Sequence, residues 1–339
     1  MNNFQNVGTF QAGIIGGSLA NSGNQPLTLD ATGIASGNAF LQAELEKRDP
    51  LLRKPLTSVT YPRDININTG GGWVDYVSAM QVGYGVTGGV TDSPVLAGGS
   101  DTVPMVQANM DKGIYKAHSF SVGMRIMFQD MQRSNFIGRS LDQMLTDGVR
   151  LAYDKHMDAN VYVGIEKFGT TGLINNPNAV RTNATTGSWS TATAEQILAD
   201  INEGLIAVWS AADYDMSALP NHILLPYEQY SMVLTRPSNQ LANESIMDYI
   251  MRNNVATKNG SDLFIGATAF CKGAGTGSTD RMVIYTNHER FVSVDELVPL
   301  TRAMSQPNVE HVCYDTAFMA NVSEVQIFYP QTIRYYDGI

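Results

Sequence analysis

Residues 139–164 have the sequence RSLDQMLTDGVRLAYDKHMDANVYVG. Side chains suited to burial recur in this stretch at steps of three and four residues, which predicts one face of a single α-helix. Ser140 is suited to cap its first turn, and Gly164 is suited to end it. At about 1.5 Å per residue the helix would be roughly 39 Å long, longer than most globular helices. We expect it to serve as a spine with a buried face made of Leu141, Leu145, Val149, Ala152, His156, Ala159 and Val163.

The composition favours a protein whose surface contacts other proteins. The chain has 339 residues, of which 43% are hydrophobic and 16% charged, and its formal net charge is −10. This length predicts two or three domains, or one elaborate domain. A polar surface with few charges suits extensive protein contacts because few charges have to be desolvated. The acidic balance, without any run of three basic residues, argues against a protein that grips nucleic acid, but not against one that encloses it.

Cysteine usage and hydropathy favour a soluble intracellular protein. Cys271 and Cys313 both lie in apolar, strand-like stretches, so we expect two buried free thiols rather than a disulfide. The sequence has no apolar run approaching the length of a membrane span and no secretory signal.

The chain before residue 139 is rich in glycine and uncharged polar residues. Residues 1–38 lack the apolar content to build a core and are expected to order only against another surface. A short helix is predicted at residues 40–52 and a strand at residues 61–68.

A long β-hairpin is predicted next. Residues 73–82 form one strand, residues 83–102 a loose glycine-rich tip, and residues 103–107 and 115–128 the returning strand. A two-stranded ribbon is marginally stable by itself in water. We therefore expect this hairpin to be stabilised by another surface, such as a second copy of the chain.

The chain after residue 164 alternates between helices and strands without a βαβ repeat, which predicts the α+β class. A turn is predicted at TGLINNP, residues 171–177, and Thr193 and Gln196 fit a capping box at the start of a second helix. The other predicted elements are an apolar helix face from Ile197 to Trp209, strands at 221–226, 263–271, 282–286, 290–294, 309–319 and 324–329, and short helices at 227–234 and 245–253.

No stretch predicts an active site. Residues 83–88 match G-x-G-x-x-G, but the sequence after them cannot begin the helix that a dinucleotide site needs, so a hairpin tip is favoured. Asp154, His156 and Asp158 are interpreted as a solvated helix edge with one packed histidine rather than a metal site. The other histidines lack zinc-site spacing. We assign no catalytic, cofactor-binding or metal-binding residues, and we expect no cofactor.

The order of these segments resembles the major capsid proteins of tailed bacteriophages, the family with the HK97-type shell fold. The resemblance covers nearly the whole chain. Its sharpest marks are GLINNP at 172–177 after a helix that ends in DANVYVG, NHILLPYEQY at 221–230, and VQIFYP at 325–330. None of these is a catalytic motif, so the resemblance depends on their order and spacing.

The resemblance implies an HK97-like capsid fold with four parts. An N-terminal arm would span residues 1–57, an extended hairpin loop 58–128, a peripheral domain with the spine helix 129–186 and 286–339, and an axial domain 187–285. The hairpin tip would lie on a neighbouring subunit. Its expected interface residues are Gly83, Tyr84, Gly85, Gly88, Gly89, Pro94, Gly98, Gly99 and Asp101.

The resemblance also implies a function in assembly rather than catalysis. Pentamers and hexamers would form an icosahedral virion shell in the host bacterial cytoplasm, enclosing double-stranded DNA without reading its sequence and without a membrane. Because the chain begins with the arm, we expect a separate scaffolding protein or none, with portal or decoration proteins as further possible partners. Lysine–asparagine cross-linking is not expected, since Lys112 lies well past the tip.

Two alternatives remain at this point. One is an encapsulin-like compartment shell that packages an enzyme. The other is a non-capsid phage structural or tail protein, or an enzyme with a glycine-rich surface.

Overall fold

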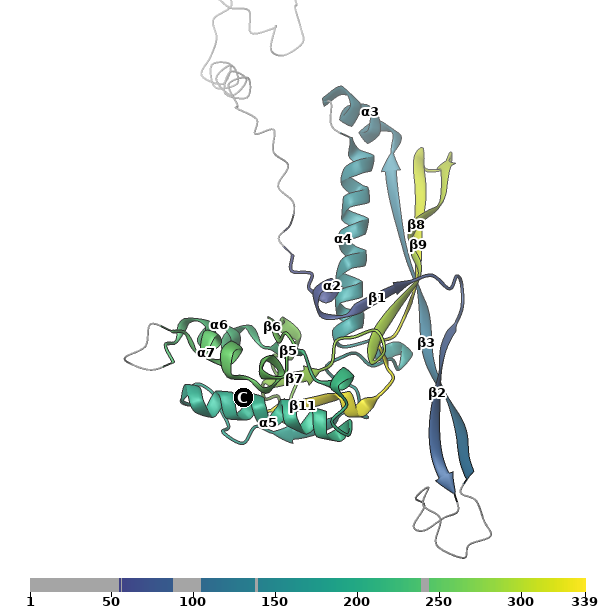
Figure 1. The fold of residues 1–339 in the computed structure, drawn as a ribbon. Coiled ribbons are helices and arrows are strands. Elements are labelled where there is room, and N and C mark those ends of the chain that lie inside the picture. Colours follow the sequence, from purple (N-terminus) through teal and green to yellow (C-terminus); the bar gives the residue numbers. More distant parts are fainter. Residues whose placement is uncertain (1–54, 56, 88–104, 138–139, 239–243) are drawn as a thin grey trace, which may run out of the picture. The chain divides into compact units, whose positions relative to one another are not determined.

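The computed structural model describes residues 55, 57–87, 105–137, 140–238 and 244–339. The chain divides into two units, Met1–Thr57 and Ser58–Ile339, and nearly all of the described residues belong to the second. This second unit combines helices with two sheets, as Figure 1 shows, so the predicted α+β class is confirmed. The segment 1–38 and the helix predicted at 40–52 lie outside the described residues.

The helices and strands have the following bounds. The helices are α2 (Tyr61–Asp64), α3 (Phe128–Ile137), α4 (Leu141–Tyr162), α5 (Ala194–Ala211), α6 (Tyr227–Thr235), α7 (Ile246–Asn253) and α8 (Val255–Lys258). The strands are β1 (Asn66–Thr69), β2 (Tyr76–Thr87), β3 (Met105–Met127), β4 (Val180–Asn183), β5 (His222–Leu225), β6 (Phe264–Ala267), β7 (Arg281–Tyr285), β8 (Val292–Asn308), β9 (Cys313–Ser323), β10 (Gln326–Ile327) and β11 (Ile333–Asp337).

Helix α4 is the predicted spine helix, and its ends are fixed as its sequence indicates. The Ser140 hydroxyl accepts a hydrogen bond from the backbone N–H of Gln143. After the helix, Gly164 has a φ of +77° and donates to the carbonyls of Ala159 and Asn160. A Cβ on Gly164 would lie 2.6 Å from the carbonyl oxygen of Thr170, so only glycine fits there.

The predicted buried face of α4 is right in its first half and wrong in its second. Val149 is buried, but Ala152 and Val163 are exposed, and Tyr153 and Met157 are buried instead. The first half of α4 packs against the first sheet and Met131 of α3. The second half of α4 enters the main core, which contacts a neighbouring stripe of the helix.

The predicted TGLINNP turn closes the C-terminal end of α4. The backbone N–H of Leu173 donates to the carbonyl of Val161 over 2.8 Å, and that of Ile174 donates to Tyr162 over 3.0 Å. The side-chain amide of Asn175 donates to the carbonyl of Val163 over 2.7 Å. The turn therefore satisfies carbonyls that the end of a helix leaves unpaired.

The first sheet has the strand order β1-β8-β9-β3-β2, with β10 paired to β8. Strand β3 has two partners in succession. Its first half pairs with β2, from Met105 opposite Thr87 to Lys116 opposite Tyr76. Its second half, from Ala117 onward, pairs with β9. One continuous strand thus joins a two-stranded ribbon to a sheet that α4 covers on one face.

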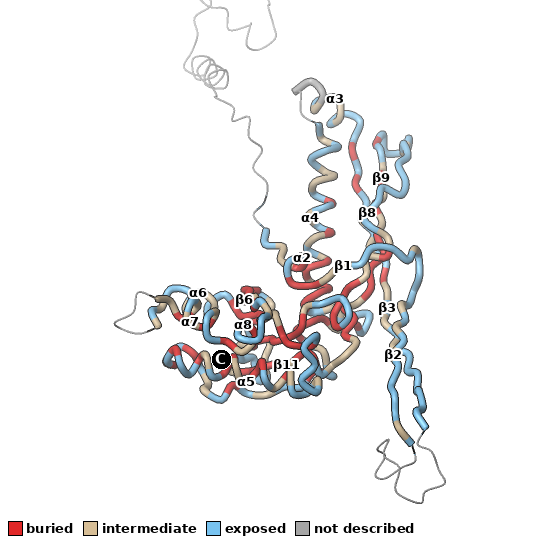
Figure 2. Tube along the Cα trace, viewed as in Figure 1, coloured by how far each residue is buried: buried red, intermediate tan, exposed pale blue. Residues whose placement is uncertain are grey.

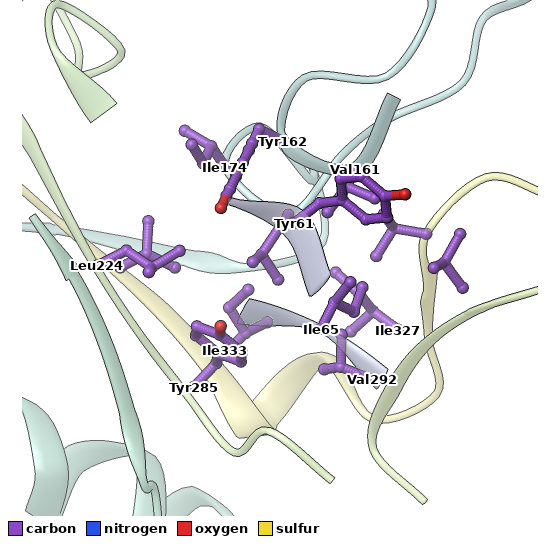
Figure 3. Close-up of a cluster of buried hydrophobic side chains, with 14 of the residues drawn as sticks. Tyr61, Ile65, Val161, Tyr162, Ile174, Leu224, Tyr285, Val292, Ile327 and Ile333 are labelled. Atoms are coloured by element: carbon purple, nitrogen blue, oxygen red, sulfur yellow. The ribbon is translucent and has the colours of Figure 1, made fainter. Parts of the chain in front are cut away.

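The second sheet has the order β4-β11-β7-β5-β6 and packs against α5. Thr193 and Gln196 form the predicted capping box at the start of α5. The predicted apolar face of α5 is confirmed, because Ile197, Ile201, Leu205 and Val208 are all fully buried. The main core, shown in Figure 3, contains side chains from α4 and from both sheets, among them Val161, Tyr285, Val292 and Ile333.

Several predicted strands are wrong in position. Residues 61–64 form α2, because a carboxylate of α4 holds the amides at its start. Strand β8 continues to Asn308, β9 begins only at Cys313, and β10 is two residues long. The closing strand β11 was not predicted. Strands β4 and β11 pair in the same sheet as β5, β6 and β7, so the predicted range 286–339 contains strands of both sheets. The boundaries of the peripheral and axial domains remain a prediction.

Candidate subunit interface

The ribbon of β2 and the first half of β3 is exposed along most of its length. It is mostly pale blue, with some tan segments, in Figure 2. The strands pair without a break to Thr87 and Met105, so residues 83–87, predicted as part of the loop, are strand. The described parts of the two predicted strand segments, 105–107 and 115–127, belong to one strand, β3, and Phe128 begins α3.

The base of the ribbon is fastened to the chain's own C-terminal segment. The Tyr115 hydroxyl donates to the carbonyl of Ile327 over 3.0 Å, and its ring meets the Phe328 ring edge-on at 5.9 Å. The Gln81 side-chain amide donates to the carbonyl of Phe328. Burial, together with the Glu324 carboxylate, raises the pKa of Tyr115, so this hydroxyl stays protonated and remains a donor.

The two faces of the ribbon differ in chemistry. Directly paired residues point to the same face. One face carries large apolar side chains that are 45–76% exposed: Tyr76, Met80, Val82, Tyr84, Val106, Met110 and Ile114. The opposite face carries mostly small or polar residues, including Ala79, Gly83, Gly85, Gln107, Asn109 and Gly113, and its larger side chains are Val77, Met105 and Tyr115. We call the first the apolar face.

The structure describes three of the predicted interface residues. Gly83, Tyr84 and Gly85 lie within β2 and are exposed, with Tyr84 on the apolar face at 76% exposure. Gly88, Gly89, Pro94, Gly98, Gly99 and Asp101 lie outside the described residues. Sequence reasoning missed Met80, Val82, Met110 and Ile114. The alternation of apolar residues from Tyr76 to Val86 could have indicated the first two.

Residues considered for chemistry have structural partners. Nε2 of His156 lies 3.1 Å from Nε2 of His118 on β3. Asp158 is buried and accepts from two backbone amides, so its interpretation as part of a solvated edge was wrong. Lys112 lies on the apolar face, and Lys116 at the base of the ribbon donates to the carbonyl of Phe168. Within the described ranges no group of three or more His, Cys, Asp or Glu side chains could hold a metal ion.

The prediction of two buried free cysteines is confirmed. Cys271 and Cys313 are both buried and free. Burial raises the pKa of the Cys271 thiol, which keeps it protonated and unreactive. None of the helices in the described part of the chain is both long and apolar enough to cross a membrane.

The part of the first sheet formed by β3, β8 and β9 has a hollow on the face that α4 does not cover. It has a volume of about 380 Å³. Gly123 and Ala317, directly paired on β3 and β9, form its floor. Met304 on β8 and the Arg125–Asp315 ion pair, with an Nε–Oδ1 distance of 2.7 Å, border it. We call this hollow the trough.

The fold of this chain is similar to that of several solved capsid structures. Among solved structures, the chain is similar to the capsid of Myoviridae phage XM1, with a TM-score of 0.73 and 13% identity over 88% of this chain and 98% of that one. It is similar to the capsid of a native GTA particle, with a TM-score of 0.62 and 10% identity over 91% and 99% of the two chains. For a virus-like particle from Pyrococcus furiosus the TM-score is 0.50, with 12% identity over 81% and 91%.

These identities are low, so the structural likeness establishes the HK97-type fold alone. No curated protein matches the chain. A family model described as major capsid protein matches residues 92–339, which is most of the sequence. The chain therefore belongs to the major capsid protein family and is a structural protein of a capsid shell.

Proposed function

We propose that copies of this chain form the pentamers and hexamers of an icosahedral shell around the double-stranded DNA of a tailed bacteriophage. The observation that carries this proposal is the exposed apolar face of the ribbon. A ribbon of two strands with one bare apolar face is marginally stable in water. Contiguous apolar surface of this kind marks a protein interaction site. In a family of shell proteins the partner available at high concentration is another copy of the same chain.

The charge of the chain is compatible with enclosing DNA. A subunit with a net charge of −10 offers few phosphate contacts, so packaged DNA would slide along the shell without being held at one sequence. We place assembly in the cytoplasm of the host bacterium. Scaffolding, portal and decoration proteins are the further partners we propose. The role of the chain is structural and not enzymatic.

The test is to shorten the ribbon without loosening its base. Gln81 and Asp111 are directly paired, so Val82–Met110 can be replaced by Asn-Gly, a sequence suited to a tight hairpin turn. This variant retains Gln81 and Tyr115, which hold the base. We expect a soluble, folded subunit that forms no shells in electron micrographs, beside full-length chain that does.

Two outcomes would contradict the proposal. Normal shells from the shortened chain would refute the role of the ribbon. Full-length particles that contain a cargo protein and no DNA would indicate a protein compartment instead of a virion. Urea unfolding of the shortened subunit is the control, because it separates a failure to assemble from a failure to fold.

A further inference from the structure

The apolar face of the ribbon carries two highly exposed methionines. Met80 is 74% exposed and Met110 is 72% exposed. Among the five methionines that are more than half exposed in the described part of the chain, these two are the most exposed. Met157 and Met282, by contrast, are at most 1% exposed and lie in the core. A dissolved oxidant therefore reaches the sulfur atoms of Met80 and Met110 while the core methionines of the folded subunit stay protected.

Met80 and Met110 form one patch in the middle of the apolar face. Val82 lies directly opposite Met110, and Met80 is two residues before Val82 on the same strand. Met80 and Met110 are therefore diagonal neighbours, a distance that long side chains span. Tyr84, at 76% exposure, is the other diagonal neighbour of Met110. A chemical change at either sulfur thus alters the same part of the apolar face.

Hydrogen peroxide converts methionine to its sulfoxide. A lone pair of the thioether sulfur attacks one peroxide oxygen, and the O–O bond breaks. The attacked oxygen is transferred to sulfur, its proton passes to the departing hydroxide, and water is released. Sulfur is oxidised by two electrons and the peroxide is reduced by two. An apolar side chain becomes one with a polar S=O group, which accepts hydrogen bonds.

A sulfoxide in this patch is compatible with a free subunit but not with a buried interface. In the free subunit, water solvates the S=O group. Lys112, directly opposite Met80, offers a hydrogen-bond donor to a sulfoxide there, but Val82, directly opposite Met110, offers none. Covering the patch would therefore remove water from the sulfoxide of Met110 without replacing its hydrogen bonds, which costs free energy.

We propose that Met80 and Met110 form an oxidation site that controls assembly, because a subunit that carries sulfoxides there does not enter the shell. The inference rests on the proposed function, in which another copy of the chain covers the apolar face. The oxidant is hydrogen peroxide. Once the face is covered, the neighbouring copy shields both sulfur atoms. Oxidation thus acts on subunits before assembly and not on finished shells.

The experiment treats free subunits of the full chain with hydrogen peroxide, removes the excess with catalase and then starts assembly. Peptide mass spectrometry measures the sulfoxide at each methionine, and electron microscopy gives the yield of shells. The test variant combines Met80→Leu with Met110→Leu, because leucine has a similar volume and has no sulfur to oxidise. The matched control combines Met105→Leu, on the opposite face of the ribbon, with Met216→Leu, outside the ribbon. The two control positions are 68% and 58% exposed.

We expect peroxide to lower the yield of shells about tenfold or more for the unmodified chain and for the control variant, because the buried sulfoxide weakens every contact that the patch makes. The test variant should assemble equally well with and without peroxide. Methionine sulfoxide reductases A and B with a dithiol convert the sulfoxide back to methionine, with a disulfide and water as the other products. This treatment should restore the yield of the oxidised unmodified chain. Urea unfolding should show that the oxidised subunit is still folded.

Several results would overturn the inference. They are a normal yield of shells from subunits fully oxidised at Met80 and Met110, a loss of yield in the test variant as large as in the unmodified chain, no recovery after reduction, or an oxidised subunit that is unfolded. Equal oxidation of both methionines in finished shells and in free subunits would also overturn it. Absence of shells from the unoxidised, unmodified chain would instead refute the proposed function.

Discussion

Oδ1 of Asp158 accepts a hydrogen bond of 3.0 Å from the backbone N–H of Tyr61. The same oxygen accepts from the backbone N–H of Thr60 over 3.0 Å. A carboxylate on the last turns of α4 therefore binds the two amides at the start of α2. Burial raises the pKa of Asp158, and the two amide hydrogen bonds oppose that rise.

Replacing Asp158 with alanine should lower the free energy of unfolding by about 1–3 kcal/mol, because two buried amides lose their acceptor. Urea denaturation of the isolated subunit measures this loss. Asp158→Asn keeps one oxygen at the same position and should lose clearly less. Equal losses in the two variants would show that the carboxylate, and not its hydrogen bonds to the amides, is what matters there.

The contact between Asp158 and Tyr61 also illustrates a feature that local sequence patterns do not predict. Helices α4 and α5 could be predicted because their caps and apolar faces are local patterns. The conformation of Tyr61–Asp64 could not, because it depends on a carboxylate far away in sequence. The second half of α4 was misjudged for a related reason: which stripe of a helix is buried depends on the strands packed beneath it.

The sequence indicated the hairpin as an interface but not which of its residues form the apolar face. Glycines at 83, 85 and 88 indicated a loop, but Gly83 and Gly85 lie in a paired strand on the face opposite the large apolar side chains. The alternation from Tyr76 to Val86 is the stronger signal there. The trough depends on three strands brought together by the fold, so no single stretch of sequence could have indicated it.

Arg281 and Asp337 form a buried ion pair between β7 and β11, and removing one partner should be costly. The Nε–Oδ1 distance is 2.7 Å, both side chains are at most 3% exposed, and Nη1 of Arg281 also donates to the carbonyl of Ile174. Arg281→Met should lower the free energy of unfolding by about 3–5 kcal/mol. The exposed pair Arg302–Asp142 is the control, and Arg302→Met should change it by about 1 kcal/mol or less. If urea denaturation gave similar losses of unfolding free energy for Arg281→Met and Arg302→Met, the larger contribution expected of the buried ion pair would be contradicted.

Gly172 and Gly148 should respond oppositely to alanine. A Cβ on Gly172 would lie 2.4 Å from the carbonyl carbon and oxygen of Tyr162, so the turn that closes α4 has to move. We expect Gly172→Ala to cost about 3 kcal/mol or more. Gly148 lies inside α4 with no atom within 4 Å of a Cβ, and Gly148→Ala should stabilise by up to about 1 kcal/mol. Thermal unfolding of both variants tests the pair, and a stable Gly172→Ala would show that the turn is not tightly fixed.

Buried His118 and its half-buried neighbour His156 should make the subunit sensitive to acid. Their Nε2 atoms lie 3.1 Å apart, and Nδ1 of His118 is buried without a hydrogen-bond partner. Burial, with His156 as a further cause, lowers the pKa of His118 to about 4, and burial lowers the pKa of His156. His118 therefore stays neutral in the folded chain at a pH at which an unfolded histidine is already protonated.

The sign of the pH dependence follows from these shifts. Both pKa values are lowered on folding, so the stability contribution is complete above pH 6.5, the unfolded value, and is lost as the pH falls toward about 4. After allowance for solvent screening we expect a loss of about 2 kcal/mol across this window. His118→Gln removes the buried titrating ring and should flatten the curve of unfolding free energy against pH, whereas His288→Gln at an exposed position should leave it unchanged. A curve from His118→Gln as steep as that of the unmodified chain would assign the acid sensitivity to carboxylates elsewhere.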